Sequence, residues 1–136
     1  MKRSPIRAKR AAPRRTTGRD GHGPGMDTAR AEVMARARGR CEVAGPGCTG
    51  AATDAHHRQT RRYGPDCPCN LLALCSHCHH VNVHGQPEAA RDLGWIVSRH
   101  ATDPGARCVQ VVRLGLVLLT CEGTYRALDG RELPGN

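Results

Sequence analysis

Large aromatic side chains are scarce in this sequence, which contains one Trp, two Tyr and no Phe among 136 residues. Such side chains usually supply much of the apolar surface that a small core buries. The chain has room for one domain of modest size, and a domain so poor in aromatics needs another source of stability. The eight cysteines indicate what that source is.

Long hydrophobic segments are also lacking. The longest apolar run covers 114–119 and contains Gly115, so it is far too short to span a bilayer. No apolar stretch of the kind found in secretory signals follows the charged first residues. We therefore expect a cytoplasmic protein without membrane association. In a reducing cytoplasm, closely spaced cysteines hold metal ions more often than they form disulfides.

Excess positive charge is lacking over most of the chain and is confined to one end. Residues 1–40 carry twelve Lys and Arg against three acidic residues, whereas residues 41–136 carry nine basic and nine acidic residues. Residues 1–25 mix Arg, Lys, Pro and Gly without apolar periodicity, which predicts a disordered basic arm. Such an arm attracts nucleic acid without selecting a sequence. The alternative is that its charge serves solubility alone.

Apolar spacing and turn signals divide the rest of the chain into a core over 26–94 and an extension over 95–136. The core mixes helices and strands, which predicts an α+β fold with an N-terminal helix. The expected helices cover about 27–38, 76–84 and 87–93, and the expected strands cover 51–58 and 70–74. The extension is expected to resemble a β-hairpin, with β-segments over 95–97, 109–114 and 116–121.

Cysteine and histidine are concentrated in one stretch: six of the eight cysteines and six of the eight histidines lie between Cys41 and His84. A structural zinc site needs four such ligands in a tetrahedron, and a CxxC turn directs two sulfurs at one ion. Cys75 and Cys78 have this spacing. We predict that Cys41 and Cys48, which flank a reversal rich in Gly and Pro, complete one structural zinc site.

Alternatives to this quartet remain open. Cys67 and Cys69 form a competing pair, although a single intervening residue is a strained arrangement for two ligands of one zinc. His77 is a candidate for a mixed Cys/His quartet. Four residues elsewhere are not expected to bind metal: His22, His100, Cys108 and Cys121. The two histidines are expected at the surface, and the two cysteines are expected to face each other as small buried side chains.

The remaining histidines predict a second site, because zinc bound by four cysteines is closed to chemistry. His56 and His57 are neighbours in an expected strand, where successive side chains point to opposite sides. One imidazole can then bind a cation while the other faces a substrate. The run AHHR is followed by NLLALC and by CxxCH with a further histidine. Over about 36–84 the chain therefore resembles the zinc-stapled subgroup of the HNH endonucleases, and its tail PEAARDLGWIVSR resembles small phage-encoded members.

The resemblance implies a ββα-metal core, in which two strands and a helix hold one divalent cation. It implies that His56 is a metal ligand and that His57 is the general base that takes a proton from the attacking water. Asn70 corresponds to the central N of the motif and is expected to hold the loop between the strands and to orient His57. The cation is Mg²⁺, Mn²⁺, Ni²⁺ or Zn²⁺, and the sequence does not choose among them.

The helix ligands implied by the resemblance are His79 and His84. His79 directly follows the CxxC turn, but it lies five residues before His84. His80 is the alternative, since it lies four residues before His84 and residues at this spacing are neighbours on an α-helix.

The implied activity is metal-dependent DNA endonuclease activity, and Arg58, Arg61 and Arg62 are expected to hold phosphate oxygens near the base. The alternative for these arginines is a solvated loop. The phage-type resemblance implies a role in DNA processing or packaging, with terminase or packaging proteins as partners. A non-catalytic zinc-stabilised DNA-binding module is the competing function, and it leaves the histidine pair unexplained. A zinc-stabilised interaction protein leaves the basic arm unexplained as well.

Overall fold

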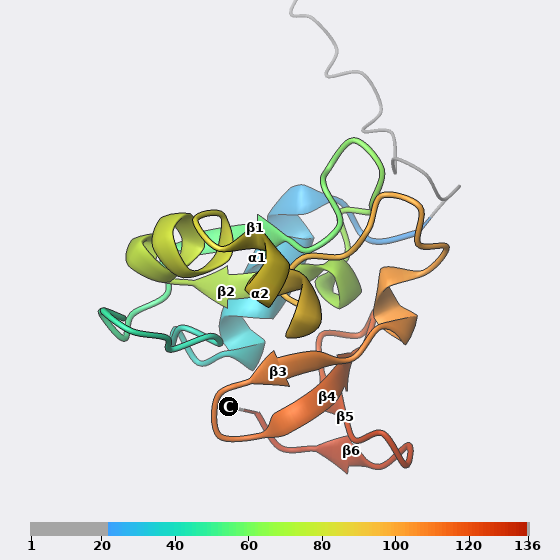
Figure 1. The fold of residues 1–136 in the computed structure, drawn as a ribbon. Coiled ribbons are helices and arrows are strands. Elements are labelled where there is room, and N and C mark those ends of the chain that lie inside the picture. The colour runs from blue at the N-terminus through green and yellow to red at the C-terminus, as the bar shows by residue number, and fades with distance from the viewer. Residues whose placement is uncertain (1–21, 136) are drawn as a thin grey trace, which may run out of the picture.

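Short helices and two antiparallel sheets make up the fold, in agreement with the predicted α+β class (Figure 1). The computed structural model describes residues 22–135. Most of the basic arm predicted over 1–25 therefore lies outside the described residues. Within the described range, no helix combines the length and the apolarity that a bilayer crossing requires.

The elements follow one another through short connections. The helical elements are α1 (Met26–Arg36), η1 (Pro68–Asn70), η2 (Cys78–Val83), α2 (Pro87–Asp92) and η3 (Pro104–Ala106). The strands are β1 (Asp54–His57), β2 (Leu71–Leu74), β3 (Val109–Val111), β4 (Gly115–Leu119), β5 (Tyr125–Arg126) and β6 (Glu132–Leu133). Strands β1 and β2 form one antiparallel sheet, and β3 to β6 form the other in chain order.

Strand β2 lies between two apolar layers, and all four of its residues are buried. Successive side chains of a strand point to opposite faces, and β2 uses both faces for packing. Leu71 and Ala73 pack with buried side chains of α1. Leu72 and Leu74 pack with the apolar residues of the second sheet. The strand that pairs with the histidine-bearing β1 is therefore fixed from both sides.

The second sheet differs from the expected hairpin-like extension. It has four strands, and the β-segment predicted over 95–97 is not a strand. The backbone amides of Trp95 and Ile96 both donate to the carbonyl of Ala90 at the end of α2, and the Val97 amide donates to the Arg58 carbonyl. Because these three amides donate to carbonyls of the core, they do not form the hydrogen-bond ladder of a strand.

One hydrophobic cluster crosses the predicted boundary between the core and the extension. It joins Leu72 and Val83 from the core to Val109, Val117 and Tyr125 from the second sheet. All five side chains are fully buried. Fully burying an aliphatic side chain of this kind contributes about 1.5–3 kcal/mol, so the second sheet contributes directly to the stability of the segment that carries the histidines.

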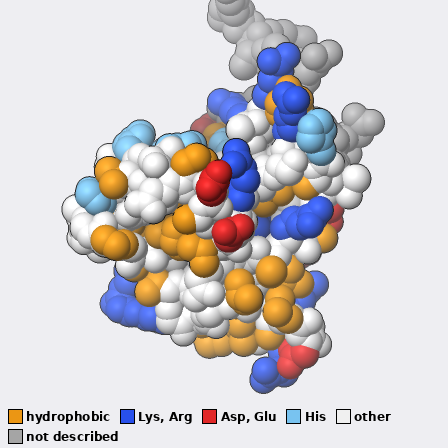
Figure 2. Space-filling model, viewed as in Figure 1, with side chains coloured by type: hydrophobic (Ala, Val, Ile, Leu, Met, Phe, Trp, Pro, Cys, Tyr) orange, Lys and Arg blue, Asp and Glu red, His pale blue; other side chains and the backbone are white. Residues whose placement is uncertain are grey.

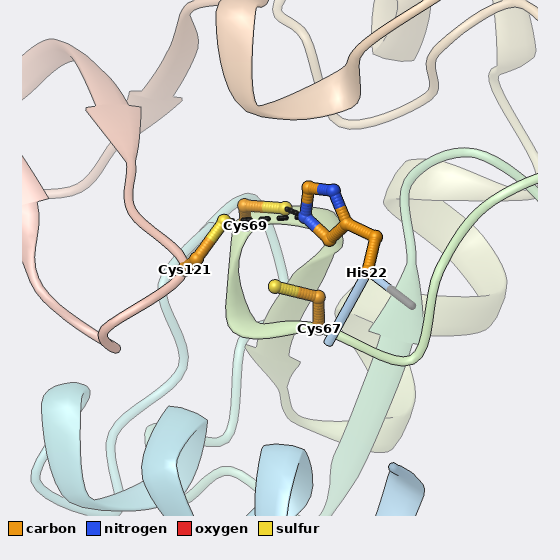
Figure 3. Close-up of side chains that lie close together, drawn as sticks. All are labelled: His22, Cys67, Cys69 and Cys121. Atoms are coloured by element: carbon orange, nitrogen blue, oxygen red, sulfur yellow. Dashed lines mark hydrogen bonds between the residues drawn. The ribbon is translucent and has the colours of Figure 1, made fainter. Parts of the chain in front are cut away.

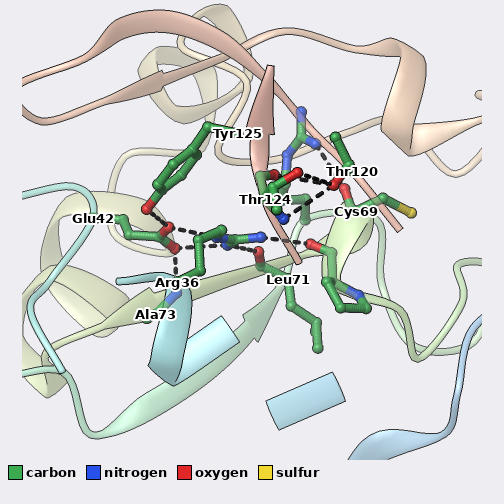
Figure 4. A network of polar contacts seen from close by, with 10 residues as sticks. Arg36, Glu42, Cys69, Leu71, Ala73, Thr120, Thr124 and Tyr125 are labelled. Carbon is green, nitrogen blue, oxygen red and sulfur yellow. Dashed lines mark hydrogen bonds and ion pairs between the residues drawn. The ribbon is translucent and has the colours of Figure 1, made fainter. Parts of the chain in front are cut away.

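A buried carboxylate links elements that are distant in the sequence (Figure 4). Arg36, at the end of α1, donates from Nε and Nη2 to the two carboxylate oxygens of Glu42, each over 2.9 Å. The same carboxylate accepts hydrogen bonds from the backbone amide of Ala73 in β2 and from the hydroxyl of Tyr125 in β5. The side chains of Arg36 and Glu42 are no more than 1% exposed.

The charges in this network stabilise one another. Burial by itself lowers the pKa of Arg36, but the Glu42 carboxylate outweighs burial and the net change is upward. Burial and the same carboxylate raise the pKa of the Tyr125 hydroxyl. Both groups therefore keep their protons at neutral pH and remain donors to Glu42.

Replacing Glu42 by alanine should destabilise the fold strongly, because the variant leaves the Arg36 guanidinium buried without its counter-charge. We expect Glu42→Ala to lower the free energy of unfolding by about 3–5 kcal/mol, measured by urea denaturation of the zinc-loaded protein. Glu88, an exposed residue of α2, is the control, and Glu88→Ala should change stability by less than about 0.5 kcal/mol. Equal stabilities of the two variants would contradict the central role of Glu42.

Candidate functional site

The four cysteines that the sequence grouped together converge in the structure. The Sγ atoms of Cys41, Cys48, Cys75 and Cys78 all lie within 4.8 Å of one another. Cys41 and Cys48 flank the predicted reversal, whose Gly47 has a φ of 78°. A side chain at this position is disfavoured, because residues other than glycine rarely adopt such a φ, and a Cβ atom there would also overlap the His77 ring. This four-cysteine cluster is compatible with a structural zinc site.

Backbone amides point at the sulfur atoms of the four-cysteine cluster. The amide of Gly50 lies 3.3 Å from the Cys48 sulfur, and the amide of Cys78 lies 3.3 Å from the Cys75 sulfur. Burial raises the pKa of the Cys48 and Cys78 thiols, whereas at Cys75 hydrogen-bond donors including the Cys78 amide outweigh burial and lower the pKa to about 6. Since the thiolate is the form that binds a metal ion, these donors favour metal binding. His77 and the competing pair Cys67 and Cys69 lie outside this cluster.

Three histidines come together on one side of β1. His56 lies on β1, and its ring centroid is 5.2 Å from that of His79 and 5.1 Å from that of His84. The centroids of His79 and His84 are 4.9 Å apart, and each of the three rings offers a nitrogen within 4.8 Å of the others. Figure 2 shows histidine side chains gathered on the surface over η2.

A widened helical turn explains why His79 and His84 face the same way. Element η2 is a π-helix, and the His84 amide donates to the His79 carbonyl, five residues earlier, over 3.1 Å. In an α-helix, residues five apart would be separated by about 140° around the axis. The π-helical turn brings them back into register, and such turns often occur at functional sites. The structure thus places His80 outside the His56 group, with a 66% exposed side chain.

Hydrogen bonds orient two of these imidazoles. His56 Nε2 lies 2.8 Å from the Trp95 carbonyl oxygen, which can only accept, so Nε2 carries the proton. His79 Nδ1 lies 2.8 Å from a carboxylate oxygen of Asp54 and donates to it. These contacts leave His56 Nδ1 and His79 Nε2 with lone pairs. Metal-binding histidines are usually oriented by partners of these two types.

The uncharged form is favoured at two of the three histidines. Burial lowers the pKa of His56 to about 3. His84 is exposed, and partial desolvation together with the neighbouring His79 and His80 lowers its pKa. The hydrogen bond from His79 lowers the pKa of Asp54. Asp54 was not among the predicted site residues, although it lies two residues before His56 and therefore on the same face of β1.

His57 points away from this group, as the strand alternation predicts. Its Nε2 lies 2.8 Å from a carboxylate oxygen of Asp66. The side chains of His57 and Asp66 are 14% and 5% exposed. Asp66 was not among the predicted site residues. It lies in the polar loop between the strands, nine residues after His57, and the sequence does not show how a loop of this length folds back.

Asn70 closes the loop between β1 and β2. Its Oδ1 accepts the Gln59 amide over 2.8 Å, and its Nδ2 donates to the carbonyls of Gln59 and Pro65 over 2.9 and 3.2 Å. These contacts match the expected loop-holding role. The direct hydrogen-bond partner of His57 is Asp66, so any effect of Asn70 on the imidazole acts through the loop.

The expected phosphate contact of Arg58 is wrong. Its side chain is buried, and its guanidinium donates to backbone carbonyls of Cys69, Gly94, Pro104, Arg107 and Cys108. Arg58 follows His57 in the chain and therefore points to the same side as the buried His56. Arg61 and Arg62 are exposed and remain candidates for phosphate contact.

A second cluster of cysteine and histidine corrects three further expectations. His22 was expected to be a surface residue away from any metal site, but its Nε2 lies 3.1 Å from the Cys69 sulfur and 3.2 Å from the Cys121 sulfur. Cys67 completes a four-residue group compatible with structural zinc. Cys108 and Cys121 are exposed and do not form the expected buried pair. His22 and Cys121 are 99 positions apart in the sequence, so local spacing could not reveal this cluster.

Comparison of the chain with known protein families, with curated proteins and with solved structures gave no match. The observations that bear on function are therefore the four-cysteine cluster, the second Cys/His cluster, the three converging histidines and the pair formed by His57 and Asp66.

Replacing Cys75 by serine tests the four-cysteine cluster as a zinc site. We expect Cys75→Ser to lose about one zinc ion per chain, measured by elemental analysis after gel filtration, and to lower the melting temperature because zinc binding contributes folding free energy. Cys108→Ser is the matched control, since Cys108 is exposed and belongs to neither cluster. Unchanged zinc content in Cys75→Ser would refute the site.

Proposed function

We propose that this protein is a metal-dependent DNA endonuclease of the HNH type, in which β1, β2 and η2 form a ββα-metal site. The observation that carries the proposal is the arrangement around β1. Three imidazoles meet on one side of the strand, and His57 pairs with Asp66 on the other. A purely structural zinc protein has no need for this division of the two adjacent histidines.

The donor set of His56, His79 and His84 fits a divalent cation. Two of the rings have their tautomers set by hydrogen bonds that leave a lone pair on the opposite nitrogen. Imidazole suits Ni²⁺, Zn²⁺ and related borderline ions, while the water and phosphate ligands of an open site also suit Mg²⁺ and Mn²⁺. A cation held there would polarise a phosphate and neutralise charge on the departing 3′ oxygen.

His57 supplies the base in this proposal. Its Nε2 donates to Asp66, so the neutral imidazole carries its lone pair on Nδ1 and can take a proton from water at that atom. The Asp66 carboxylate accepts this hydrogen bond, holds the ring in this tautomer and stabilises the imidazolium that forms. Asn70 keeps the loop that carries Asp66 closed.

The substrate in this proposal is DNA. Arg61 and Arg62 are exposed on the loop next to His57, where their guanidinium groups can hold phosphate oxygens. The whole excess positive charge of the chain lies in residues 1–40, which favours binding to nucleic acid through counterion release. The resemblance to small phage-encoded nucleases supports a setting in phage DNA processing or packaging, in the cytoplasm and with terminase or packaging proteins as partners.

Plasmid nicking tests the activity and the base together. We expect nicking of supercoiled DNA with Mg²⁺, Mn²⁺ or Ni²⁺ that is lost with chelator, and a loss of about 10²–10⁴-fold in His57→Ala. His100→Ala is the matched control because His100 is exposed and outside the site. Nicking that persists in His57→Ala would refute the base assignment. DNA binding without nicking in the unmodified protein would instead support a non-catalytic zinc-stabilised DNA-binding module.

Cation binding separates the two candidate helix ligands. With the structural zinc sites filled, we expect His79→Ala to weaken Mn²⁺ binding by at least about tenfold, measured by electron paramagnetic resonance of free Mn²⁺. His80→Ala should bind Mn²⁺ like the unmodified protein, because its exposed ring lies outside the His56 group. The reverse ranking of the two variants would show that His80 is the ligand.

A further inference from the structure

The second Cys/His cluster brings four metal-binding side chains together from three separate parts of the chain (Figure 3). His22 precedes α1, Cys67 and Cys69 flank Pro68 at η1, and Cys121 follows β4. One ligand atom from each residue lies within 4.8 Å of the others. We propose that these residues bind a second structural zinc ion, separate from the four-cysteine cluster.

The composition of the cluster favours zinc over a disulfide. Three cysteines and one histidine form one of the common donor sets of structural zinc, which takes four ligands in a tetrahedron. A disulfide among Cys67, Cys69 and Cys121 would use two sulfurs and leave the third thiol and His22 without a partner. A zinc ion uses all four side chains.

The local backbone overcomes the one-residue spacing of Cys67 and Cys69. Cys67 is extended, and the chain then turns through η1, which lets both sulfurs reach the same place (Figure 3). Both cysteines are fully buried. The backbone of Gly23 packs directly on Cys67, since a Cβ atom on that glycine would lie 2.8 Å from the Cys67 Cβ. The contact holds the segment next to His22 against the other ligands.

Arg58 gives a second and independent indication of negative charge at this cluster. The guanidinium is buried, and its five hydrogen bonds go to backbone carbonyls, which carry no net charge. A buried cation is costly without a counter-charge. Zinc with three thiolates and one neutral imidazole carries a net charge of about −1, and Arg58 contacts the Cys69 carbonyl over 3.1 Å. The zinc site would therefore place negative charge close to this buried cation.

A zinc ion at this position would also hold the proposed catalytic loop, a consequence that rests on the proposed function. Cys67 directly follows Asp66, and Cys69 directly precedes Asn70. The C-terminal end of the loop that presents Asp66 to His57 would then be tied to the segment before α1 and to the segment after β4 through one ion. His22, Cys67, Cys69 and Cys121 would be positioning residues for the base, without contact to the substrate.

Metal content tests the inference on the full chain. After a weak chelator has emptied the histidine site, we expect two zinc ions per chain by native mass spectrometry, and one in either Cys121→Ser or Cys75→Ser. Cys108→Ser should keep both ions, because this exposed cysteine lies outside both clusters. One zinc in the unmodified protein that is lost in Cys75→Ser would overturn the inference. A mass lower by about 2 Da with one zinc would show a disulfide in place of the metal.

His22 allows a gentler test in case the cysteine variants fail to fold, because it is only partly buried and precedes α1. We expect His22→Ala to release the second zinc to a chelator at least tenfold more readily, and His22→Cys to restore retention by providing a fourth thiolate. Equal zinc retention in His22→Ala and the unmodified protein would overturn the inference. Two zinc ions in a protein that does not cleave DNA would leave this site standing while refuting the proposed nuclease function.

Discussion

The rest of this structure depends on the buried ion pair between Glu42 and Arg36. The Glu42 carboxylate accepts hydrogen bonds from Arg36 of α1, from the Ala73 amide of β2 and from Tyr125 of β5, so it joins both sheets to the N-terminal helix. Cys41 directly precedes it, and these contacts therefore also place a ligand of the four-cysteine cluster. In a chain with so few aromatic side chains, a satisfied ion pair connects layers that apolar packing alone would hold less firmly. Buried polar groups stabilise a fold in this way only when each of them has its hydrogen-bond partners.

The arrangement of histidines combines two backbone periodicities. Alternation along β1 sends His56 and His57 to opposite sides, which separates the candidate cation site from the candidate base. The π-helical turn of η2 then brings His79 and His84 to the side of His56. Neither effect requires a loop to move, since each imidazole lies on or beside a hydrogen-bonded element. Rigid placement of this kind suits a site whose groups must be held in fixed geometry before substrate binds.

The loop between β1 and β2 is held by polar contacts because it has little apolar surface of its own. Asn70 closes it from within, and Arg58 ties its far end to the segments around η3 through backbone carbonyls. The loop carries Asp66, the partner of His57. Two residues of the second Cys/His cluster, Cys67 and Cys69, belong to this loop, and Arg58 contacts the Cys69 carbonyl. A metal ion in that cluster would therefore both order the loop and place negative charge near Arg58.

The sequence by itself determined the α+β class, the approximate position of the principal helices and strands, the grouping of Cys41 with Cys48, Cys75 and Cys78, and the opposite orientations of His56 and His57. These features depend on local spacing, which the sequence shows directly. Only the tertiary structure decided the π-helical turn, the burial of Arg58, the pairing of His57 with Asp66 and the meeting of His22 with Cys121. These features depend on contacts between segments far apart in the chain, or on how a helix adapts to its neighbours, and local periodicity carries no information about either.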